Sequence, residues 1–181
     1  MSATQAFIIL FRGVGGATQL PTAPLRAALT QAGFDNVATY INSGNAVVRS
    51  AWSREKTVAA IAKICADQFG FTKAIYAPTL TEWQKIIDAN PFEIAEGAGK
   101  FTHAAWLEST PKPENIARLK DVMIASEGFE IINNIAYIHT PDGLSSSQLG
   151  MKFDKWIGVP NTARNWNTVL KLAELGEKAG Q

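Results

Sequence analysis

Hydrophobic and polar positions in the first part of the chain alternate between a strand pattern and a helix pattern. A continuous apolar run over residues 5–11 predicts a strand that is covered on both faces or flanked on both edges. Apolar residues at helical spacing predict one helix from about Thr22 to Gly33 and another over residues 53–69. Three β-prone runs predict further strands near residues 36–41, 45–50 and 71–77. The order β-α-β-β-α-β is the split β-α-β unit of ferredoxin-like folds, in which the first strand is central.

The turn of the central hairpin is the most clearly marked element. Asn42-Ser43-Gly44-Asn45 stands between two β-prone runs. Because Asn and Gly tolerate positive φ, these four residues can reverse the chain tightly. The sequence therefore predicts a β-hairpin over residues 39–48.

The pattern restarts in the second part of the chain. Residues 101–107 predict a strand, residues 113–125 a helix, and two short runs around Asn133-Asn134 a hairpin that suits a type I′ turn. This order repeats the first four elements of the first half in topology but not in sequence. The copy does not finish like the first half, because a short helical patch and a last helix over about residues 162–178 follow.

These elements predict an α+β fold of two ferredoxin-like (split β-α-β) subdomains, the second incomplete, with the C-terminal helix packing across. The first subdomain is expected over residues 1–77 and the second over residues 101–181. A connecting helix and a linker are expected over residues 78–100.

Composition and charge narrow the class of protein. The 181 residues are 46% hydrophobic and 18% charged, which suffices for a packed core and is too little charge for a disordered chain. The net charge of +1 gives no support to a dedicated nucleic-acid module, although a local basic patch stays open. Cys65 is the only cysteine, which excludes an intramolecular disulfide. Without a basic leader or an apolar run of transmembrane length, a soluble cytoplasmic protein is expected.

Three stretches of the chain resemble the signatures of one family. Arg12-Gly13 with Gly15-Gly16 and Pro21 resembles its N-terminal signature, and residues 39–45 closely resemble its central hairpin. Thr162-Ala163-Arg164-Asn165-Trp166-Asn167-Thr168 resembles its C-terminal signature. The family is the bacterial domain of unknown function 1697. The resemblance implies an α+β fold of two ferredoxin-like subdomains and implies no established activity.

The chain departs from that family pattern at two places. The N-terminal loop is shortened between Gly13 and Gly15 and lacks the basic residue expected after the glycine pair. Ser146 and Gln148 stand near positions where the family tends to carry Arg and Lys. Both departures remove positive charge or hydrogen-bond donors from positions suited to anion binding.

The loop Gly13-Val14-Gly15-Gly16 follows a strand, as phosphate-binding loops do. A P-loop needs a Lys followed by Ser or Thr after its last glycine, and this loop has neither. The dinucleotide-binding fingerprint needs a third glycine in register, where this chain has Thr18. A mobile loop that turns the chain is therefore the favoured interpretation.

Arg164 is predicted in the opening turn of the last helix, where the helix dipole repels an exposed cation by about 0.3–1 kcal/mol. A guanidinium beside free helix N–H groups would form a compact site for phosphate or carboxylate. Alternatively, it binds a carboxylate or carbonyl of the linker and fixes the last helix, an interpretation that is slightly favoured. Trp166 is expected in the core, with Asn165 and Asn167 projecting to different sides of it.

Together these features give the hypothesis that a small anionic ligand or nucleotide binds between the two halves. Arg12 and Arg164 would neutralise the anion, N–H groups of the glycine loop would cradle it, and asparagines of the signatures would orient it. The candidate ligand-binding residues are Arg12, Gly13, Gly15, Gly16, Asn42, Ser43, Asn45, Arg164, Asn165 and Asn167. Turn chemistry alone also explains the three that lie in the hairpin.

Other functions stay open. Nucleic acid binding across an open sheet face would use Phe7, Phe11 and Tyr40 for stacking, although the sequence lacks the RNP1 pattern. A protein-interaction module without a ligand is the third class. No cofactor or membrane partner is predicted. A metal site is not predicted either, since His103 and His139 have no ligand partners at suitable spacing. An enzyme ranks lowest, because no nucleophile–base pair is visible.

Overall fold

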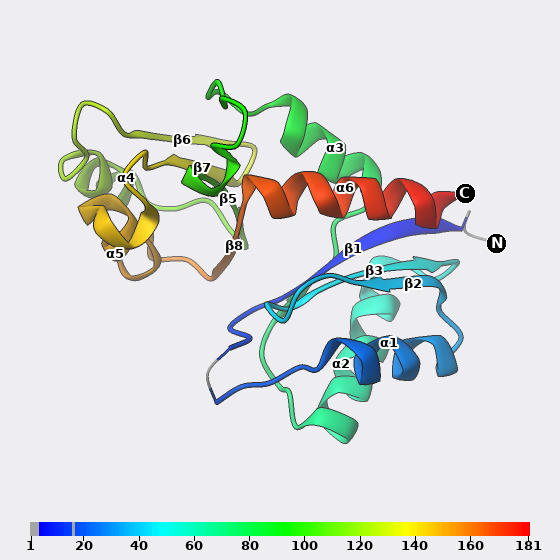
Figure 1. Ribbon diagram of the computed structural model, residues 1–181. Helices are drawn as coiled ribbons and strands as arrows, with labels where there is room; N and C mark the ends of the chain where they lie inside the picture. The colour runs from blue at the N-terminus through cyan, green and yellow to red at the C-terminus, as the bar shows by residue number, and fades with distance from the viewer. Residues whose placement is uncertain (1–3, 16) are drawn as a thin grey trace. The chain divides into compact units, whose positions relative to one another are not determined.

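The computed structural model describes residues 4–15 and 17–181 (Figure 1). The chain divides into two units: the chain up to Lys85 with Lys171–Gln181 forms the first, and Ile86–Leu170 forms the second. Each unit contains one four-stranded antiparallel sheet, and six α-helices over the described residues complete an α+β fold. The boundary between the units falls within α3 (Leu80–Asp88) and α6 (Trp166–Gly180). None of the helices in the described part of the chain is long and apolar enough to cross a membrane.

The first unit follows the predicted order of elements. In chain order these are β1 (Gln5–Phe11), α1 (Thr22–Gln31), β2 (Asp35–Thr39), β3 (Asn45–Ser50), α2 (Arg54–Phe69) and β4 (Ile75–Tyr76). The strand order in the sheet is β2-β3-β1-β4. Because β1 pairs with both β3 and β4, the continuous apolar run is the central strand that its hydrophobicity predicts.

The strand predicted over residues 71–77 is shorter in the structure. Gly70 ends α2 with a φ of 64°, and the N–H of Phe71 donates to the carbonyl of Cys65 at 3.1 Å. This Schellman motif uses the first residues after the glycine to close the helix. The strand β4 therefore begins only at Ile75.

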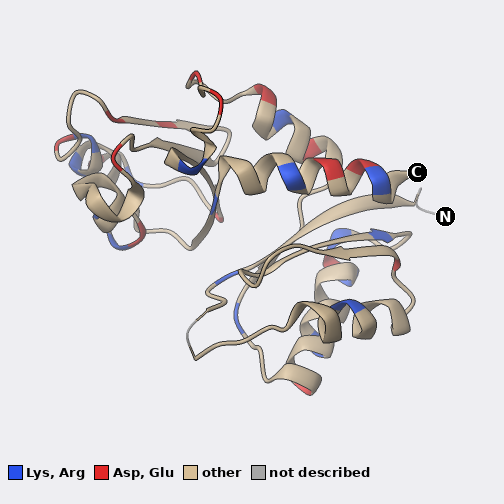
Figure 2. Cartoon of the chain, viewed as in Figure 1, with Lys and Arg blue, Asp and Glu red and all other residues tan. Residues whose placement is uncertain are grey.

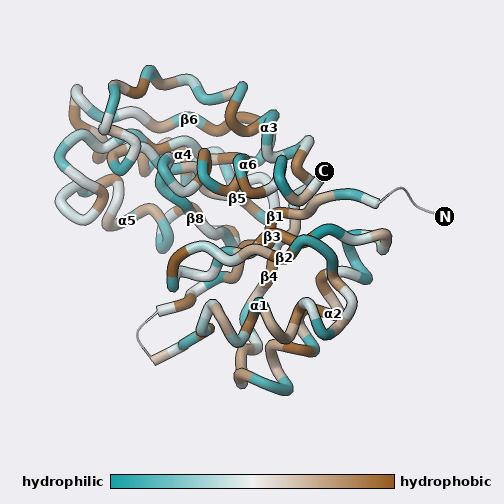
Figure 3. Tube along the Cα trace, turned by 45° about the vertical axis from the view of Figure 1, so that its right-hand side comes forward, coloured by the Kyte–Doolittle hydropathy of each residue, from teal (hydrophilic) through white to brown (hydrophobic). Residues whose placement is uncertain are grey.

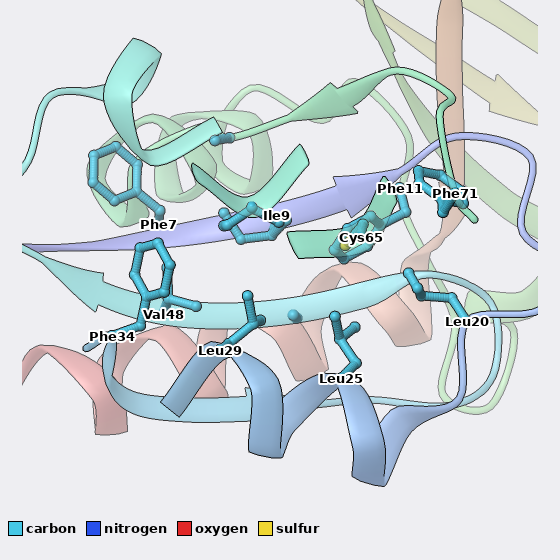
Figure 4. Packing of buried hydrophobic residues seen from close by; sticks show 13 residues of the cluster. Phe7, Ile9, Phe11, Leu20, Leu25, Leu29, Phe34, Val48, Cys65 and Phe71 are labelled. Atoms are coloured by element: carbon cyan, nitrogen blue, oxygen red, sulfur yellow. The ribbon is translucent and has the colours of Figure 1, made fainter. Parts of the chain in front are cut away.

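One core of the first unit lies between α1, α2 and one face of the sheet. Figure 4 shows side chains from β1, β3 and the two helices pointing toward one another in this core. Its members without solvent exposure include Phe7, Ile9, Phe11, Leu29, Val48, Ile61 and Cys65. Burial raises the pKa of the Cys65 thiol to about 12, so this cysteine packs as a small hydrophobic residue.

The opposite face of the same sheet is also covered. Ile8, Leu10 and Val47 alternate along their strands with the residues of the first core and are at most 1% exposed. Gly176 of α6 lies against this face, since a Cβ at this glycine would come within 3.0 Å of the Ile8 Cδ1 atom. The absent side chain lets the end of α6 pack closely on β1. Figure 3 shows the hydrophobic residues that run through these strands.

The second unit repeats the same order of elements around its own sheet. These are β5 (Thr102–Leu107), α4 (Pro113–Lys120), β6 (Gly128–Ile132), β7 (Ile135–His139), α5 (Gln148–Trp156) and β8 (Asn161–Asn165). Two short 3₁₀ helices, Gly99–Phe101 and Leu144–Ser146, precede β5 and α5. The strand order is β6-β7-β5-β8, which matches that of the first sheet. The predicted type I′ hairpin is confirmed, because Asn133 and Asn134 have φ values of 50° and 62°.

The strand β8 corrects the prediction that the second half is incomplete. Residues Asn161–Asn165 pair with β5 and form the fourth strand of the sheet. The last helix begins at Trp166 rather than near Thr162, because the Asn165 Oδ1 atom accepts the N–H of Thr168 at 3.0 Å and caps it. The apolar stripe shows which face of the helix is buried but does not mark this start. The pairing of residues 161–165 with the distant strand β5 determines where the helix starts.

Candidate functional site

Three segments that are far apart in the sequence meet at the end of β1 in the first unit. The N–H of Phe11 donates to the carbonyl of Gly44 at 2.9 Å, and the N–H of Arg12 donates to the carbonyl of Ala74 at 3.0 Å. The loop after β1, the β2–β3 turn and the segment before β4 therefore lie side by side. We refer to them as the β1-end site, which comprises residues 12–15, 17–18, 40–45 and 72–74.

Gly44 holds the β2–β3 turn against the loop after β1. Its φ is 80°, a conformation that favours glycine. A Cβ at this position would lie 2.8 Å from the carbonyl oxygen of Phe11 and 2.8 Å from Cγ2 of Val14. The turn and the loop are therefore in direct contact, and any side chain at Gly44 would push them apart.

Lys73 brings a positive charge to the glycine loop. Its Nζ atom donates to the carbonyl of Gly13 at 3.0 Å and to Oγ1 of Thr18 at 3.1 Å. An ammonium group has three N–H donors, so these two contacts leave one for a ligand. The side chain is exposed. Figure 2 marks the end of β1 and the segment before β4 as basic.

Lys73 is not among the candidate residues that the sequence predicts. The residue stands in a run that reads as a strand, and its partners in the loop lie 60 and 55 positions away. A cation in an otherwise β-prone run was the only available signal. The structure thus supplies a basic side chain at the loop whose sequence lacks one after the glycine pair.

The backbone of the glycine loop is partly engaged within the loop itself. The N–H of Gly15 donates to the carbonyl of Thr18 at 2.8 Å, and the N–H of Thr18 donates back to Gly15 at 3.0 Å. The predicted use of the Gly15 N–H for an anion therefore requires this pair of bonds to open. Gly13 has a φ of 67° and packs against Lys73. Gly16, the remaining predicted member, lies outside the described residues.

The polar residues of the β2–β3 turn divide into two kinds. Asn45 is 2% exposed, and its Nδ2 atom donates to the carbonyl of Tyr40 at 3.2 Å and to Oγ of Ser43 at 3.0 Å. This side chain holds the turn in shape. Asn42 and Ser43 are exposed and carry a side-chain amide and a hydroxyl on this turn.

The backbone of this turn differs from the sequence prediction. Positive φ was expected among residues 42–45, and it occurs at Ile41 (45°) and Gly44 (80°). Asn42 and Asn45 have ordinary negative φ values, since neither is among the positive-φ residues. The turn itself lies at residues 42–44, within the predicted stretch, and the residue just before it, Ile41, also has a positive φ although it is β-branched.

Arg164 lies in β8 and not in the opening turn of the last helix. It is 9% exposed, and its Nη1 atom donates to Oγ1 of Thr162 at 2.7 Å and to the carbonyl of Ala163 at 2.8 Å. Burial lowers the pKa of its guanidinium to about 10, so the side chain stays charged at neutral pH. In the sheet it pairs with Ala104, which places both side chains on the same face.

Asn165 and Asn167 are tied to the start of α6. Asn165 caps the helix, as described above. Asn167 is exposed and lies against Gly99, because a Cβ at this glycine would overlap the Asn167 Oδ1 atom. Trp166, between them, is 6% exposed and belongs to the interior.

The structure therefore brings the predicted site residues together as two groups, one within each unit. The group of the first unit consists of Arg12, Gly13, Gly15, Asn42, Ser43 and Asn45. The group of the second unit consists of Arg164, Asn165 and Asn167. Lys73 joins the first group.

The two histidines have separate surroundings in the second unit. Burial lowers the pKa of His103 to about 4, and its Nδ1 atom has no partner among the described residues. The Nδ1 atom of His139 is 2.9 Å from Oγ1 of Thr102. Within residues 4–15 and 17–181, no three His, Cys, Asp or Glu side chains are grouped as metal ligands.

Comparison with protein families identifies a related family. The model described as "Protein of unknown function (DUF1697)" matches residues 4–137. The matched region contains the glycine loop, the central hairpin and Lys73. The C-terminal signature around Arg164 lies outside it. No curated protein matches the chain.

Comparison with solved structures gives a fold-level likeness. The conserved bacterial protein SP0830 from Streptococcus pneumoniae is similar with a TM-score of 0.69 and 21% identity, over 96% of this chain and 99% of that chain. A proposed glycine cleavage system transcriptional repressor aligns with 17% identity over 90% of this chain and 98% of that chain. Its TM-score of 0.27 is too low to support any conclusion. At 21% identity, the first likeness shows the fold alone.

Proposed function

The chain belongs to the DUF1697 family, described as proteins of unknown function, and we propose from the β1-end site that it binds a small anionic ligand. A nucleotide or another organic phosphate fits this class. The family description names no activity, so the proposal is based on the chemistry of the site.

Lys73 is the residue that carries the proposal. Its ammonium is held at the glycine loop by two hydrogen bonds, to Gly13 and Thr18, and stays exposed to solvent. The side chain of Arg12 starts from the neighbouring backbone, since the Arg12 N–H is bonded to the residue after Lys73. Two positive charges at one strand end attract an anion, with about 1 kcal/mol per charge pair at 4 Å in water and more when water is partly excluded.

Polar groups of the β2–β3 turn suit the orientation of such a ligand. Asn42 and Ser43 are exposed on the turn that Gly44 holds against the loop. An amide and a hydroxyl supply both donors and acceptors, which an anion with sugar or phosphate oxygens can use. Asn45 contributes by holding the turn in shape.

The second group of candidate residues supports a weaker case. Arg164 is charged and buried, and two of its contacts are to its own strand. Asn165 is used as a helix cap. We keep Arg164 and Asn167 as candidates for binding, but the ligand site that we propose does not depend on them.

We also infer that each unit is a ferredoxin-like (split β-α-β) subdomain. The order β-α-β-β-α-β and the strand order of both sheets support this assignment. In the first unit, α1 and α2 contribute to the same core on one face of the sheet.

Nucleic acid binding across a sheet face receives less support. Phe7 and Phe11, two of the three stacking candidates, have no solvent exposure and belong to the core under α1 and α2. Stacking of bases requires exposed aromatic faces. Only Tyr40 of the three candidates is partly exposed.

Titration followed by ¹⁵N–¹H correlation spectra tests the proposal. Inorganic phosphate and AMP are added to the full chain, and we expect the amide signals of Gly13, Gly15 and Gly44 to shift. Replacing Lys73 by Gln is expected to weaken binding about fivefold to tenfold, the effect of one charge-assisted hydrogen bond. Lys73→Arg keeps the charge and is expected to retain most of the affinity.

Lys63→Gln is the matched control. Lys63 is an exposed lysine of the same unit, paired on the surface of α2 with Asp67. It removes the same charge and is expected to leave binding unchanged. Equal affinity for Lys73→Gln and the unmodified chain, or shifts confined to residues outside the β1-end site, would contradict the proposal.

A further inference from the structure

Ile41 combines two properties that do not serve folding. Its φ of 45° lies in the left-handed region, which is costly for a β-branched residue. Its side chain is 49% exposed, so it contributes little to a core. Asn or Gly at this position would remove the strain without a loss of packing.

Exposure alone would not single out Ile41. Ile124, Met151 and Leu170 are 55%, 55% and 47% exposed, and scattered exposed hydrophobic residues are ordinary. None of these three has a positive φ. Among the exposed large hydrophobic residues described, only Ile41 is also held in a strained backbone conformation.

The surrounding contacts enforce this conformation. The N–H of Tyr40 donates to the carbonyl of Asn45 at 3.1 Å, and the Asn45 side chain donates back to the carbonyl of Tyr40 at 3.2 Å. The same side chain bonds Ser43 at 3.0 Å. Strain of this kind persists only where the neighbouring structure fixes it, and it is concentrated at functional sites.

The strained turn belongs to the β1-end site. Gly44, three residues after Ile41, would touch both Phe11 and Val14 with any added Cβ. The turn is thus seated on the loop that carries Arg12 and contacts Lys73. An apolar side chain is presented on the same turn as the polar groups of Asn42 and Ser43.

We propose that Ile41 contacts an apolar part of the ligand whose anionic group binds at the glycine loop. The ligand class is accordingly an organic phosphate or similar anion with a ring or alkyl group close to the charge, and not an inorganic anion. This inference rests on the anion site proposed above. It explains why an isoleucine occupies a position that suits Asn or Gly.

Inorganic phosphate and phenyl phosphate are the two probes that test it, with dissociation constants from amide shifts of the full chain. Phenyl phosphate is expected to bind about fivefold to tenfold more tightly, as partial burial of a ring against an isoleucine allows. In Ile41→Asn the two probes are expected to bind equally, with the affinity for inorganic phosphate unchanged. The melting temperature of Ile41→Asn is expected to rise by about 2–4 °C, because Asn tolerates the left-handed region.

Ile124→Asn is the matched control, since it removes a similarly exposed isoleucine at an ordinary φ. It is expected to keep the preference for phenyl phosphate and to give no rise in melting temperature. Ile41→Gly, which also relieves the strain, is expected to lose the preference as Ile41→Asn does.

The outcomes separate the two proposals. Equal affinity of the unmodified chain for both probes would overturn the inference about Ile41 and leave the anion site standing. Absence of binding by either probe would overturn both. A parallel loss of affinity for both probes in Ile41→Asn and Ile41→Gly would show that the turn acts through its shape, and would also overturn the apolar contact.

Discussion

The ends of β1 and β5 occupy the same place in the two units and use the same backbone bonds. In each unit, the last residue of the central strand donates to a carbonyl of the hairpin turn, and the next residue donates to a carbonyl just before the fourth strand. In the second unit these bonds join Leu107 to Asn134 and Glu108 to Pro160, each at 2.9 Å. The frame around the β1-end site is therefore repeated in a unit with an unrelated sequence.

The side chains on this shared frame differ in charge. Arg12 in the first unit corresponds to Glu108 in the second, and Lys73 corresponds to Val159. The connection to the next helix is also longer in the first unit, over residues 12–21 against 108–112. Since the second unit forms the same bonds with Glu108 and Val159 at these positions, the backbone geometry does not require the cations Arg12 and Lys73. Their presence in the first unit is consistent with the anion site proposed above.

Breaking the contact between turn and loop in the first unit gives the largest expected effect. In Gly44→Ala the new Cβ would lie 2.8 Å from the Phe11 carbonyl and from Val14, at a φ of 80°. The free energy of unfolding is expected to fall by about 2–4 kcal/mol, measured by urea denaturation.

The variant Gly33→Ala measures the cost of backbone strain in the absence of a steric clash. Gly33 has a φ of 91° and no atom within 4 Å of an added Cβ, so only the backbone cost of about 1 kcal/mol applies. The two variants are thus matched in chemistry and differ in surroundings. Equal losses in both would mean that the turn does not rest on the loop.

The second unit carries a histidine, His103, where the first unit carries a phenylalanine, and this makes the stability of the second unit depend on pH. His103 occupies the position in β5 that Phe7 has in β1, counted back from the corresponding strand ends. Burial lowers the pKa of His103 to about 4, below its ordinary value of 6.5. Between these two pH values the unfolded chain binds the proton and the folded chain does not, so stability contributed by the neutral histidine is lost as the pH falls from 6.5 to 4.

The variant His103→Phe removes this dependence and makes the second strand resemble the first. At pH 5 it is expected to gain about 2 kcal/mol relative to the unmodified chain, beyond any difference at pH 7.5. Urea denaturation at both pH values measures the gain. A constant difference between the two proteins from pH 7.5 to pH 5 would show that His103 is not the group responsible.

Local chemistry explains which parts of this architecture were predictable from the sequence. The apolar run of β1 and the Asn133-Asn134 turn follow rules that involve only neighbouring residues, and both are confirmed. The strand β8 was missed because its pairing partner β5 lies far away in the chain and its residues carry no strand pattern of their own. The helix that follows has an apolar stripe, which indicates a buried face but not a first residue.

The candidate site was predictable only where it is local. The glycines of the loop and the turn, Gly44 among them, can be recognised as candidates from their residue type alone. Lys73 belongs to the site only because its side chain reaches a loop 60 residues away in the sequence. No rule of residue spacing indicates such a contact. The strain at Ile41 is equally invisible, because a β-branched residue in that place reads as the end of a strand.

A small effect, similar in size to that of Gly33→Ala, is expected when a strained isoleucine is placed in the second turn. Asn133 has a φ of 50°, close to the 45° of Ile41, and is exposed on the β6–β7 turn. Asn133→Ile is expected to lower the free energy of unfolding by about 1 kcal/mol, because the β-branched side chain opposes this φ. The melting temperature, which is expected to fall by about 2–4 °C, measures the loss. Unchanged stability would mean that an isoleucine is tolerated in such turns at no cost, and the strain at Ile41 would then need no functional explanation.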